Sequence, residues 1–449
     1  MAGIAGIARP GQGALVEKML DRLAHRGRAT RRIIETQQAT LGVVAGSDQV
    51  VVKTDPTGRH MVCDCGGNER LASAQVIGGK LILVRDAFGV APLYYGHTDD
   101  GALCFASEVK ALLEATKDVH ELPLGASYDG LLIETHFRLA PQMPVDEPPE
   151  VVAAELRHRL AGAVESCIGN GEIGSWLSGG LDSSALAALA RPHVDHLHTF
   201  CAGLPGAPDL AFAAEVAAFI RSDHHEVVVT VDEMLAVLPE VIYHLESFDA
   251  LLVRSSIINY LVAQAASDYV PAVFSGEGGD ELLAGYEYLK SLDPAALPDE
   301  LIDITGRLHN TALQRVDRCA AAHGTLAHVA FLDPDVAAYA LQIPIEYKLR
   351  DGIEKWILRL AMDGALPERV LKRTKAKFWA GAGVGDLLAR YADAEITNAD
   401  FRRERRLSNG WMLDSKEEML YYRIFREWFG ALADLSWMGR SKGAPQIPV

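Results

Sequence analysis

Cysteine is scarce in this chain of 449 residues, with six in all, and their spacing does not complete a zinc-binding motif. Reduced, mostly buried thiols suit a cytoplasmic protein. An excess of basic charge is also lacking, because the formal net charge is −17 and a nucleic-acid surface needs clustered Lys and Arg. No signal core follows the N-terminus, and no apolar run is long enough to span a membrane. We expect a cytoplasmic protein that binds neither nucleic acid nor membrane.

What the chain does have is an ordinary globular composition, with 49% hydrophobic and 23% charged residues. Its length predicts two or three domains. Short strands separated by turn residues are predicted at 41–44, 50–52, 81–84 and 103–105, and residues 125–130 are predicted as a last turn. Several prolines between 141 and 149 are typical of a linker. We therefore predict a β-rich domain at 1–135, a linker at 136–150 and a second domain at 151–449.

The second domain alternates between helical and strand patterns. Residues 151–167 and 183–190 have helical spacing, and apolar strands are predicted at 174–177, 198–203, 226–230 and 272–275. This order predicts a doubly wound parallel sheet that binds ligands at the carboxyl ends of its strands. From about residue 311 onward the pattern is mainly helical. The overall class is α/β.

The motif Ser178-Gly179-Gly180-Leu181-Asp182-Ser183-Ser184, here called the glycine loop, joins a predicted strand to a predicted helix. Its glycines let backbone N–H groups approach phosphate oxygens, and the helix directs its positive end to the same place. Many glycine-rich turns are plain strand–helix connections. This one resembles the loop of ATP pyrophosphatases, and that resemblance implies ATP as a cosubstrate, cleaved between its α and β phosphates.

A second motif, Ser275-Gly276-Glu277-Gly278-Gly279-Asp280-Glu281, here called the acidic loop, also follows an apolar strand. Loops after neighbouring parallel strands meet at one edge of the sheet, so Asp182 and Asp280 are predicted to hold one Mg²⁺ between them. An exposed acidic turn is the alternative reading of the motif. Lys375 precedes a glycine-rich stretch, and a lysine there could close over an anionic reaction centre. Its spacing alone suits a surface lysine equally well.

The second domain resembles the synthetase domain of glutamine-dependent asparagine synthetases. Besides the two loops, the resemblance lies in residues 202–210, 241–246, 253–256, 285–286, 321–324, 331–333, 353–359, 373–375 and 415–417. It implies an ATP-dependent ligase that adenylates a carboxylate and then forms an amide, releasing AMP and pyrophosphate. The implied cofactors are ATP and Mg²⁺.

The resemblance also implies a role for each matching residue. The ATP-binding residues would be Leu177, Ser178, Gly179, Gly180, Leu181, Asp182, Ser183, Ser184, Cys201, Gly203 and Gly276. Substrate would contact Leu252, Arg254, Glu277, Gly278 and Asp280. Catalysis would depend on Glu277 beside the incoming amine, on Asp333 behind the substrate pocket, and on Lys375.

The first domain resembles the N-terminal-nucleophile glutaminase of the same family, in residues 1–7, 25–27, 85–95 and 105–108. The resemblance implies a β-sandwich of α+β class, shortened here. A working glutaminase needs a cysteine directly after the initiator methionine, whose thiolate attacks the glutamine amide. Ala2 stands there, either by natural loss or by engineering, and no Asn-Gly-Glu segment lies between Gly27 and Arg85. We therefore expect this domain to be degenerate and structural.

The substrate end departs from the family as well, because Leu251 and Leu252 replace two threonines and residues 328–330 read His-Val-Ala instead of Arg-Val-Pro. Our leading hypothesis is a ligase that joins a small-molecule carboxylate to ammonia or another amine without using glutamine. A β-lactam-synthetase-like or other amide-forming ligase on a different substrate is the alternative, and a regulatory pseudoenzyme is a third. A homodimer or a separate ammonia-supplying partner would be compatible with each.

Overall fold

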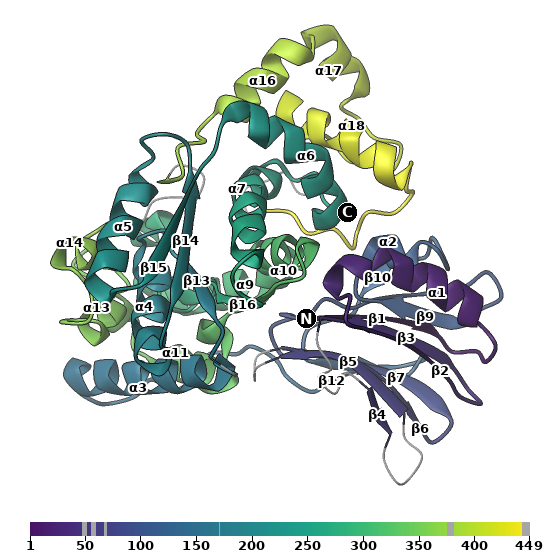
Figure 1. Cartoon of the computed structure of the whole chain (residues 1–449), viewed down its shortest axis with the longest axis horizontal. Coiled ribbons are helices and arrows are strands. Elements are labelled where there is room, and N and C mark those ends of the chain that lie inside the picture. Colours follow the sequence, from purple (N-terminus) through teal and green to yellow (C-terminus); the bar gives the residue numbers. More distant parts are fainter. Residues whose placement is uncertain (47–51, 55–59, 67–69, 170, 375–380, 442–449) are drawn as a thin grey trace.

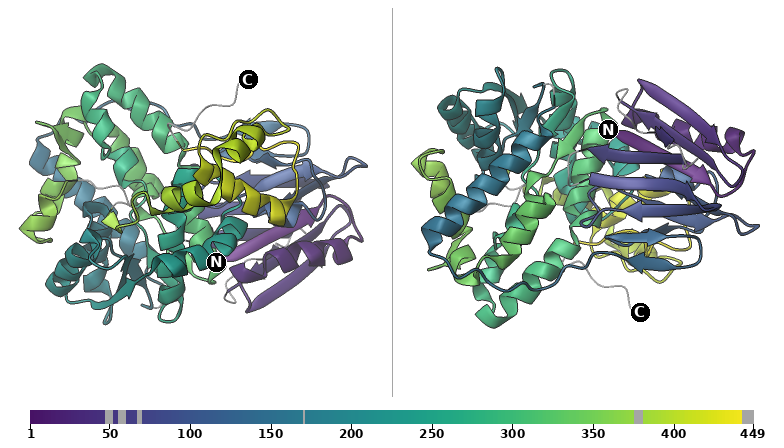
Figure 2. Two further views of the ribbon diagram at one scale, coloured as in Figure 1. Left: turned by 90° about the horizontal axis from the view of Figure 1, so that it is seen from above. Right: turned by 90° about the horizontal axis from the view of Figure 1, so that it is seen from below.

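The computed structural model describes residues 1–46, 52–54, 60–66, 70–169, 171–374 and 381–441, and Figure 1 shows them as two packed parts. One part is a β-sandwich that ends near residue 135. The other is an α/β domain with a helical C-terminal segment. Figure 2 shows from two further directions that the sandwich lies at one side of the α/β domain.

The sandwich consists of two antiparallel six-stranded sheets. The first has the order β10 (His120–Glu121), β8 (Tyr94–His97), β9 (Leu103–Ala106), β1 (Ala2–Ile7), β3 (Thr40–Ala45), β2 (Thr30–Glu35). The second has the order β12 (Ile133–Thr135), β11 (Ala126–Tyr128), β7 (Lys80–Arg85), β6 (Arg70–Ile77), β5 (His60–Gly66), β4 (Val52–Thr54). The α+β sandwich implied by the sequence is confirmed.

Apolar side chains that point inward from both sheets fill the space between them. Leu41 and Val43 of β3 face Ala72 and Ala74 of β6 within one buried apolar cluster. Successive side chains of a strand point to opposite faces, so the next residue, Val44, joins a different cluster. The helices α1 (Gly13–Arg22) and α2 (Val109–Leu112) cover that outer face of the first sheet, as Figure 1 shows.

The α/β domain is built on five parallel strands in the order β15 (Asp223–Val228), β14 (His198–Gly203), β13 (Gly174–Trp176), β16 (Ala272–Phe274), β17 (Leu326–His328). The first strand in the sequence, β13, is the central strand. The next two strands, β14 and β15, extend the sheet to one edge, and β16 and β17 then extend it from β13 to the other edge. The strand order therefore reverses between β13 and β16, which is where doubly wound sheets bind ligands. The predicted fold class is confirmed.

Helices lie on both faces of this sheet (Figure 1). The helices of the domain are α3 (Pro149–Cys167), α4 (Leu181–Ala190), α5 (Pro208–Ile220), α6 (Val231–Leu245), α7 (Ala250–Ser267), α8 (Gly279–Leu282), α9 (Leu297–Gly306), α10 (Ala312–Ala322), α11 (Pro334–Gln342), α12 (Ile345–Lys348), α13 (Trp356–Ala361), α14 (Glu368–Leu371), α16 (Leu387–Glu395), α17 (Asn398–Glu404) and α18 (Lys416–Phe429). Of these, α16, α17 and α18 form a separate group beyond the sheet (Figure 1). The short strands β18 (Leu349–Arg350) and β19 (Ile353–Glu354) form a hairpin. Within the described part of the chain, no helix is both long and apolar enough to cross a membrane.

Several predicted boundaries need correction. The predicted turn at 125–130 contains the strand β11, which pairs with β7 and β12. The strand predicted at 226–230 begins at Asp223 and ends at Val228. The strand β17 and the hairpin lie in the region that the sequence predicts as mainly helical. Most of the strand predicted at 50–52 lies outside the described residues.

A buried ionic network joins the sandwich to the α/β domain. Asp317 on α10 pairs with Arg26 and, at 2.6 Å, with Arg70. Glu246, at the end of α6, accepts hydrogen bonds at 3.0 and 2.7 Å from the first two backbone amides of α2. The side chain of Arg26 is fully buried. Charges in this position need partners within the protein, so the two parts depend on each other for neutrality.

Asp317→Asn should therefore destabilise the whole chain. Burial opposes ionisation of Asp317, but Arg26, Arg70 and Arg318 together hold its pKa well below the ordinary range. A lowered folded-state pKa contributes stability above the unfolded value of about 4 and loses it as the pH falls. Urea denaturation at pH 7 should show a loss of about 3 kcal/mol, and a smaller difference from wild type below pH 4.

Asp100→Asn is the matched control, because Asp100 makes an exposed ion pair with Arg9. It should leave the urea midpoint unchanged. Equal stability of Asp317→Asn and wild type at pH 7 would contradict the dependence of the two parts on this network.

Candidate active site

A cavity of about 770 Å³ lies at the carboxyl ends of the parallel strands. The glycine loop follows β13 and the acidic loop follows β16, so the two loops flank the point where the strand order reverses. Both loops line the cavity, together with α7, the β18–β19 hairpin region and the segment before Lys375. The fold thus brings together the two motifs that are about 100 residues apart in the sequence.

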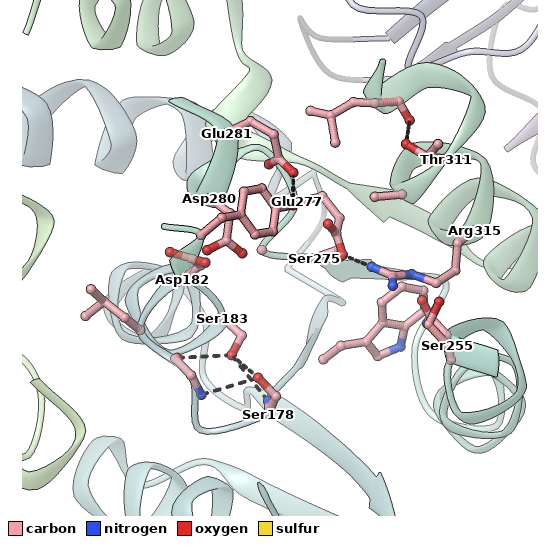
Figure 3. A pocket seen from close by; sticks show the side chains of 18 of the residues that line it. Ser178, Asp182, Ser183, Ser255, Ser275, Glu277, Asp280, Glu281, Thr311 and Arg315 are labelled. Atoms are coloured by element: carbon pink, nitrogen blue, oxygen red, sulfur yellow. Dashed lines mark hydrogen bonds and ion pairs between the residues drawn. The ribbon is translucent and has the colours of Figure 1, made fainter. Parts of the chain in front are cut away.

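The glycine loop is shaped by its own hydroxyl groups. The Ser183 hydroxyl accepts a hydrogen bond from the Ser178 backbone amide at 3.2 Å, and the two serine hydroxyls lie 3.1 Å apart. The Gly180 amide donates to the Ser178 hydroxyl at 3.3 Å. Figure 3 shows these hydrogen bonds below the carboxylates of Asp182 and Asp280. Helix α4 begins directly at Leu181, so its N-terminal amides face the cavity side of the loop.

Gly179 is required at its position because it has a φ of +65° and lies against α5. A Cβ there would stand 2.4 Å from the Cβ of Phe212 and 2.6 Å from the Ala213 backbone nitrogen. Only glycine combines this backbone conformation with so close an approach.

Lys355 joins the two loops. Its ammonium pairs with Asp182 of the glycine loop and, at 2.5 Å, with Asp280 of the acidic loop. The lysine side chain is only 3% exposed, and its backbone has a φ of +52° just before α13. Gly279 allows the loops to approach, since a Cβ there would lie 2.7 Å from the Asp182 carboxyl carbon. Two carboxylates in this position need a cation between them, and Lys355 supplies it.

The same two carboxylates have the oxygen donors that Mg²⁺ prefers. Among the described residues no group of three or more His, Cys, Asp or Glu side chains could hold a metal ion. The residues that would hold Mg²⁺ are thus the two carboxylates of Asp182 and Asp280. This fits the usual pattern in which substrate phosphates and water complete the coordination.

Two glutamates of the acidic loop have different surroundings. Glu277 forms an ion pair with Arg315 of α10 (Figure 3). Glu281 accepts a hydrogen bond from the Tyr286 hydroxyl, and burial, helped by Asp280 and Glu277, raises the pKa of Glu281 to about 7. Glu277 thus lies beside a fixed positive charge, whereas Glu281 is held in a less polar position.

Helix α7 forms one wall of the cavity, with Leu251, Leu252 and Val262 beside the polar Ser255 and Asn259. Leu251, Leu252 and Ser255 lie on one face of the helix. Arg254 falls on another face and pairs with Glu417 of α18, at 3.1 Å through Nε. It is not among the lining residues. The structure therefore does not bring Arg254 into the cavity in which the sequence places its role.

Arg373 is linked to the glycine loop and to α5. Its guanidinium donates to the Ser178 carbonyl at 3.1 Å and pairs with Asp209. Thr374 lines the cavity. Lys375 itself lies outside the described residues, so its predicted role stays a prediction.

The other predicted site residues divide into two groups. Those lining the cavity are Leu177, Ser178, Gly180, Leu181, Asp182, Ser183, Cys201, Leu252, Gly276, Glu277 and Asp280. Those outside the lining are Gly179, Ser184, Gly203, Arg254, Gly278 and Asp333. Asp333 caps α11, where its carboxylate accepts from the Asp335 amide at 2.9 Å.

Sequence reasoning missed Lys355, Arg315 and Arg373. Lys355 and Arg373 belong to segments that match the family, but nothing in the sequence alone assigns them a function. Lys355 is a single lysine after a short hairpin, and no local sequence pattern indicates that it lies between two aspartates that are distant in the sequence.

Fold and site together define an α/β protein with a ligand cavity at the switch point of a doubly wound sheet, joined to a two-sheet domain. Known proteins of this kind were found by comparison. The asparagine synthase family model matches residues 155–300 and 295–442, and the model of a glutamine amidotransferase domain matches residues 44–146. The chain belongs to the asparagine synthase family.

Curated relatives agree with this assignment. Asparagine synthetase [glutamine-hydrolyzing] 2 of Arabidopsis thaliana is 33% identical over 375 residues, covering 78% of this chain and 65% of the relative. A probable asparagine synthetase [glutamine-hydrolyzing] of Schizosaccharomyces pombe is 33% identical over 419 residues, covering 82% and 74%. Asparagine synthetase B [glutamine-hydrolyzing] of Escherichia coli is 32% identical over 372 residues, covering 78% and 67%. The chain thus spans between about two thirds and three quarters of their lengths.

Gly179→Ala tests the packing of the glycine loop. The new methyl group meets the Phe212 and Ala213 backbone, so the variant should lose about 1–3 kcal/mol more stability than Gly206→Ala. Gly206 also has a positive φ, +77°, but a Cβ added there would meet nothing within 4 Å. Urea denaturation of both variants measures the difference, and equal losses would contradict the close approach of the loop to α5.

Lys355→Met tests the cation between the loops. Removing the ammonium leaves Asp182 and Asp280 facing each other, so an added divalent cation should become stabilising there. In thermal unfolding, 5–10 mM Mg²⁺, about the range that saturates millimolar sites, should raise the Tm of the variant more than that of wild type. Lys290→Met removes a pair with Glu354 and serves as control. Identical Mg²⁺ responses of all three proteins would contradict this role for Lys355.

Proposed function

We propose that this protein is an ATP-dependent ligase that adenylates a small-molecule carboxylate and transfers the acyl group to ammonia or another amine. The observation that carries the proposal is the meeting of the glycine loop and the acidic loop in one cavity, with Asp182 and Asp280 held by a single ammonium. Family membership supports it, because the relatives are named as asparagine synthetases.

In the first step a substrate carboxylate oxygen attacks the α-phosphorus of ATP, and pyrophosphate leaves. The glycine loop and the start of α4 offer N–H groups to the phosphates. Asp182 and Asp280 would hold Mg²⁺, which offsets phosphate charge when it is bound. The predicted role of Lys375 is to stabilise the leaving pyrophosphate. Arg373, two residues earlier in the sequence, donates to the Ser178 carbonyl of the glycine loop.

In the second step the amine attacks the acyl carbon, the amide forms, AMP leaves and the nitrogen loses a proton. Glu277 is the predicted residue beside the amine. Its ion pair with Arg315 of α10 fixes the carboxylate in the cavity, which suits orienting an ammonium or amine.

We also propose that the amine does not come from glutamine hydrolysed within this chain. Ala2 carries no nucleophile and is 1% exposed, and its backbone amide donates to Asp64 at 3.2 Å. Arg26 and Arg70 pack against the same carboxylate. The match to the glutamine amidotransferase domain begins at residue 44 and so leaves out this position.

A non-aspartate substrate is a second candidate, favoured by one observation. Leu251 and Leu252 line the cavity while Arg254 pairs with Glu417 outside it. A small dicarboxylate would find an apolar wall there, and unpaired polar groups in such a position are costly. A longer, partly apolar carboxylate, as in β-lactam synthetases and other amide-forming relatives, would fit this wall better.

The test is release of AMP and pyrophosphate from ATP with Mg²⁺, ammonium and a panel of carboxylates that includes aspartate. Asp182→Asn should lower the rate at least about 100-fold, because the loop loses the charge that faces the nucleotide. Asp100→Asn, on an exposed pair, should match wild type. Near-ultraviolet circular dichroism confirms that each variant is folded.

Glutamine should not replace ammonium as the nitrogen source. Glutamine-dependent AMP formation with release of glutamate would overturn that part of the proposal while leaving the ligase intact. Absence of AMP with every carboxylate and amine would overturn the ligase itself.

A further inference from the structure

A second cavity, of about 380 Å³, lies beside α9, which also contributes to the lining of the candidate active site. Residues 141–146 form one wall of it. The linker is fixed there, because the Val145 amide donates to the Gln342 carbonyl at 2.9 Å and the Tyr347 hydroxyl donates to the Glu147 carbonyl at 3.3 Å. Ile304 of α9 faces the first cavity, whereas Leu301 and Ile302 face the second. The two cavities are therefore separate and share one helix.

Lys348 is the unusual residue of the second cavity. It ends α12, lines the cavity and is only 3% exposed. Throughout the described ranges of the chain, no ion pair or side-chain hydrogen bond engages its amine. Burial alone lowers the pKa of Lys348 to about 7. A buried ammonium without a counter-ion is costly, so an anion delivered by a ligand would relieve the cost.

The rest of the cavity has two further properties. Its walls are apolar, formed by Leu301, Ile302, Leu341, Ile343 and several prolines. Its acidic groups, Asp146 from the linker and Glu346 from α12, are exposed and lie at the rim. Neither pairs with Lys348. The cavity thus combines one buried positive group, an aliphatic interior and a negatively charged entrance.

We propose that this cavity binds a zwitterionic α-amino acid with an aliphatic side chain, with its carboxylate on Lys348 and its ammonium toward Asp146 and Glu346. A plain monocarboxylate satisfies Lys348 but is repelled at the rim. A plain amine suits the rim but leaves Lys348 unpaired. The volume is at the lower end of the range for small-molecule sites, which suits a molecule of this size.

Isothermal titration calorimetry with L-leucine at pH 7 tests the proposal. Leucine should bind saturably with a Kd below about 1 mM, and at least about 10-fold more tightly than either of its halves, 4-methylpentanoate and 3-methylbutan-1-amine. Because the carboxylate favours the ammonium form of Lys348, binding should take up protons, seen as a heat that varies with the ionisation enthalpy of the buffer. Asp146 and Glu346 are the other titratable groups that line the cavity.

Lys348→Met should abolish leucine binding. The variant should fold at least as well as wild type, because an apolar side chain replaces a buried unpaired amine, and its Tm checks this. Lys372→Met, on an exposed pair with Glu368, is the matched control and should bind leucine normally. Asp146→Asn combined with Glu346→Gln should remove the preference for leucine over 4-methylpentanoate.

Three outcomes would overturn the proposal: no saturable leucine binding to the wild-type protein, undiminished binding to a folded Lys348→Met, or 4-methylpentanoate binding as tightly as leucine. None of them bears on the ligase reaction, which is measured separately by AMP release.

Discussion

Two carboxylates from different loops can share a buried position only if a cation lies between them, and Lys355 supplies that cation in this fold. Asp182 arrives from β13 and Asp280 from β16, and both face the ammonium where the strand order reverses. Glycine at 279 removes the side chain that would hold the loops apart. A nucleotide with Mg²⁺ brings its own cation, which would compete with Lys355 for the same oxygens. The ammonium therefore holds the two loops together, and in the proposed reaction Mg²⁺ would take its place between the carboxylates.

The sandwich is held against the α/β domain by buried charges that are paired across the boundary between them. Asp317, Arg26 and Arg70 are buried across the boundary between the two parts, where none of them would be stable alone. The sandwich is thus needed to neutralise the charges of the α/β domain that it covers. This structural role does not depend on any chemistry at Ala2.

The sequence was sufficient for the parts of the fold that depend on local patterns. The strand at 198–203 and the helix at 183–190 are marked by apolar runs and by a glycine turn, and the structure has both. The strand β17 was missed because Leu326–His328 has three residues and lies between helical segments, so that only its pairing with β16 defines it. Lys355 was missed for the same reason, since its partners are up to 173 residues away.

Arg254 shows how a correct family can still leave a residue's role open. The resemblance assigns it to the substrate, but Glu417 of α18 forms a bidentate pair with it, and a charge satisfied in this way gains little by turning toward the cavity. Leu251 and Leu252 occupy the wall that a polar substrate end would need. The two departures reinforce each other, because removing polar contacts from the wall and fixing the arginine elsewhere both lower the affinity for a second carboxylate. If the proposed ligase reaction takes place here, selectivity at this end of the cavity would depend on contact with Leu251 and Leu252, while the end formed by the two loops carries the charges.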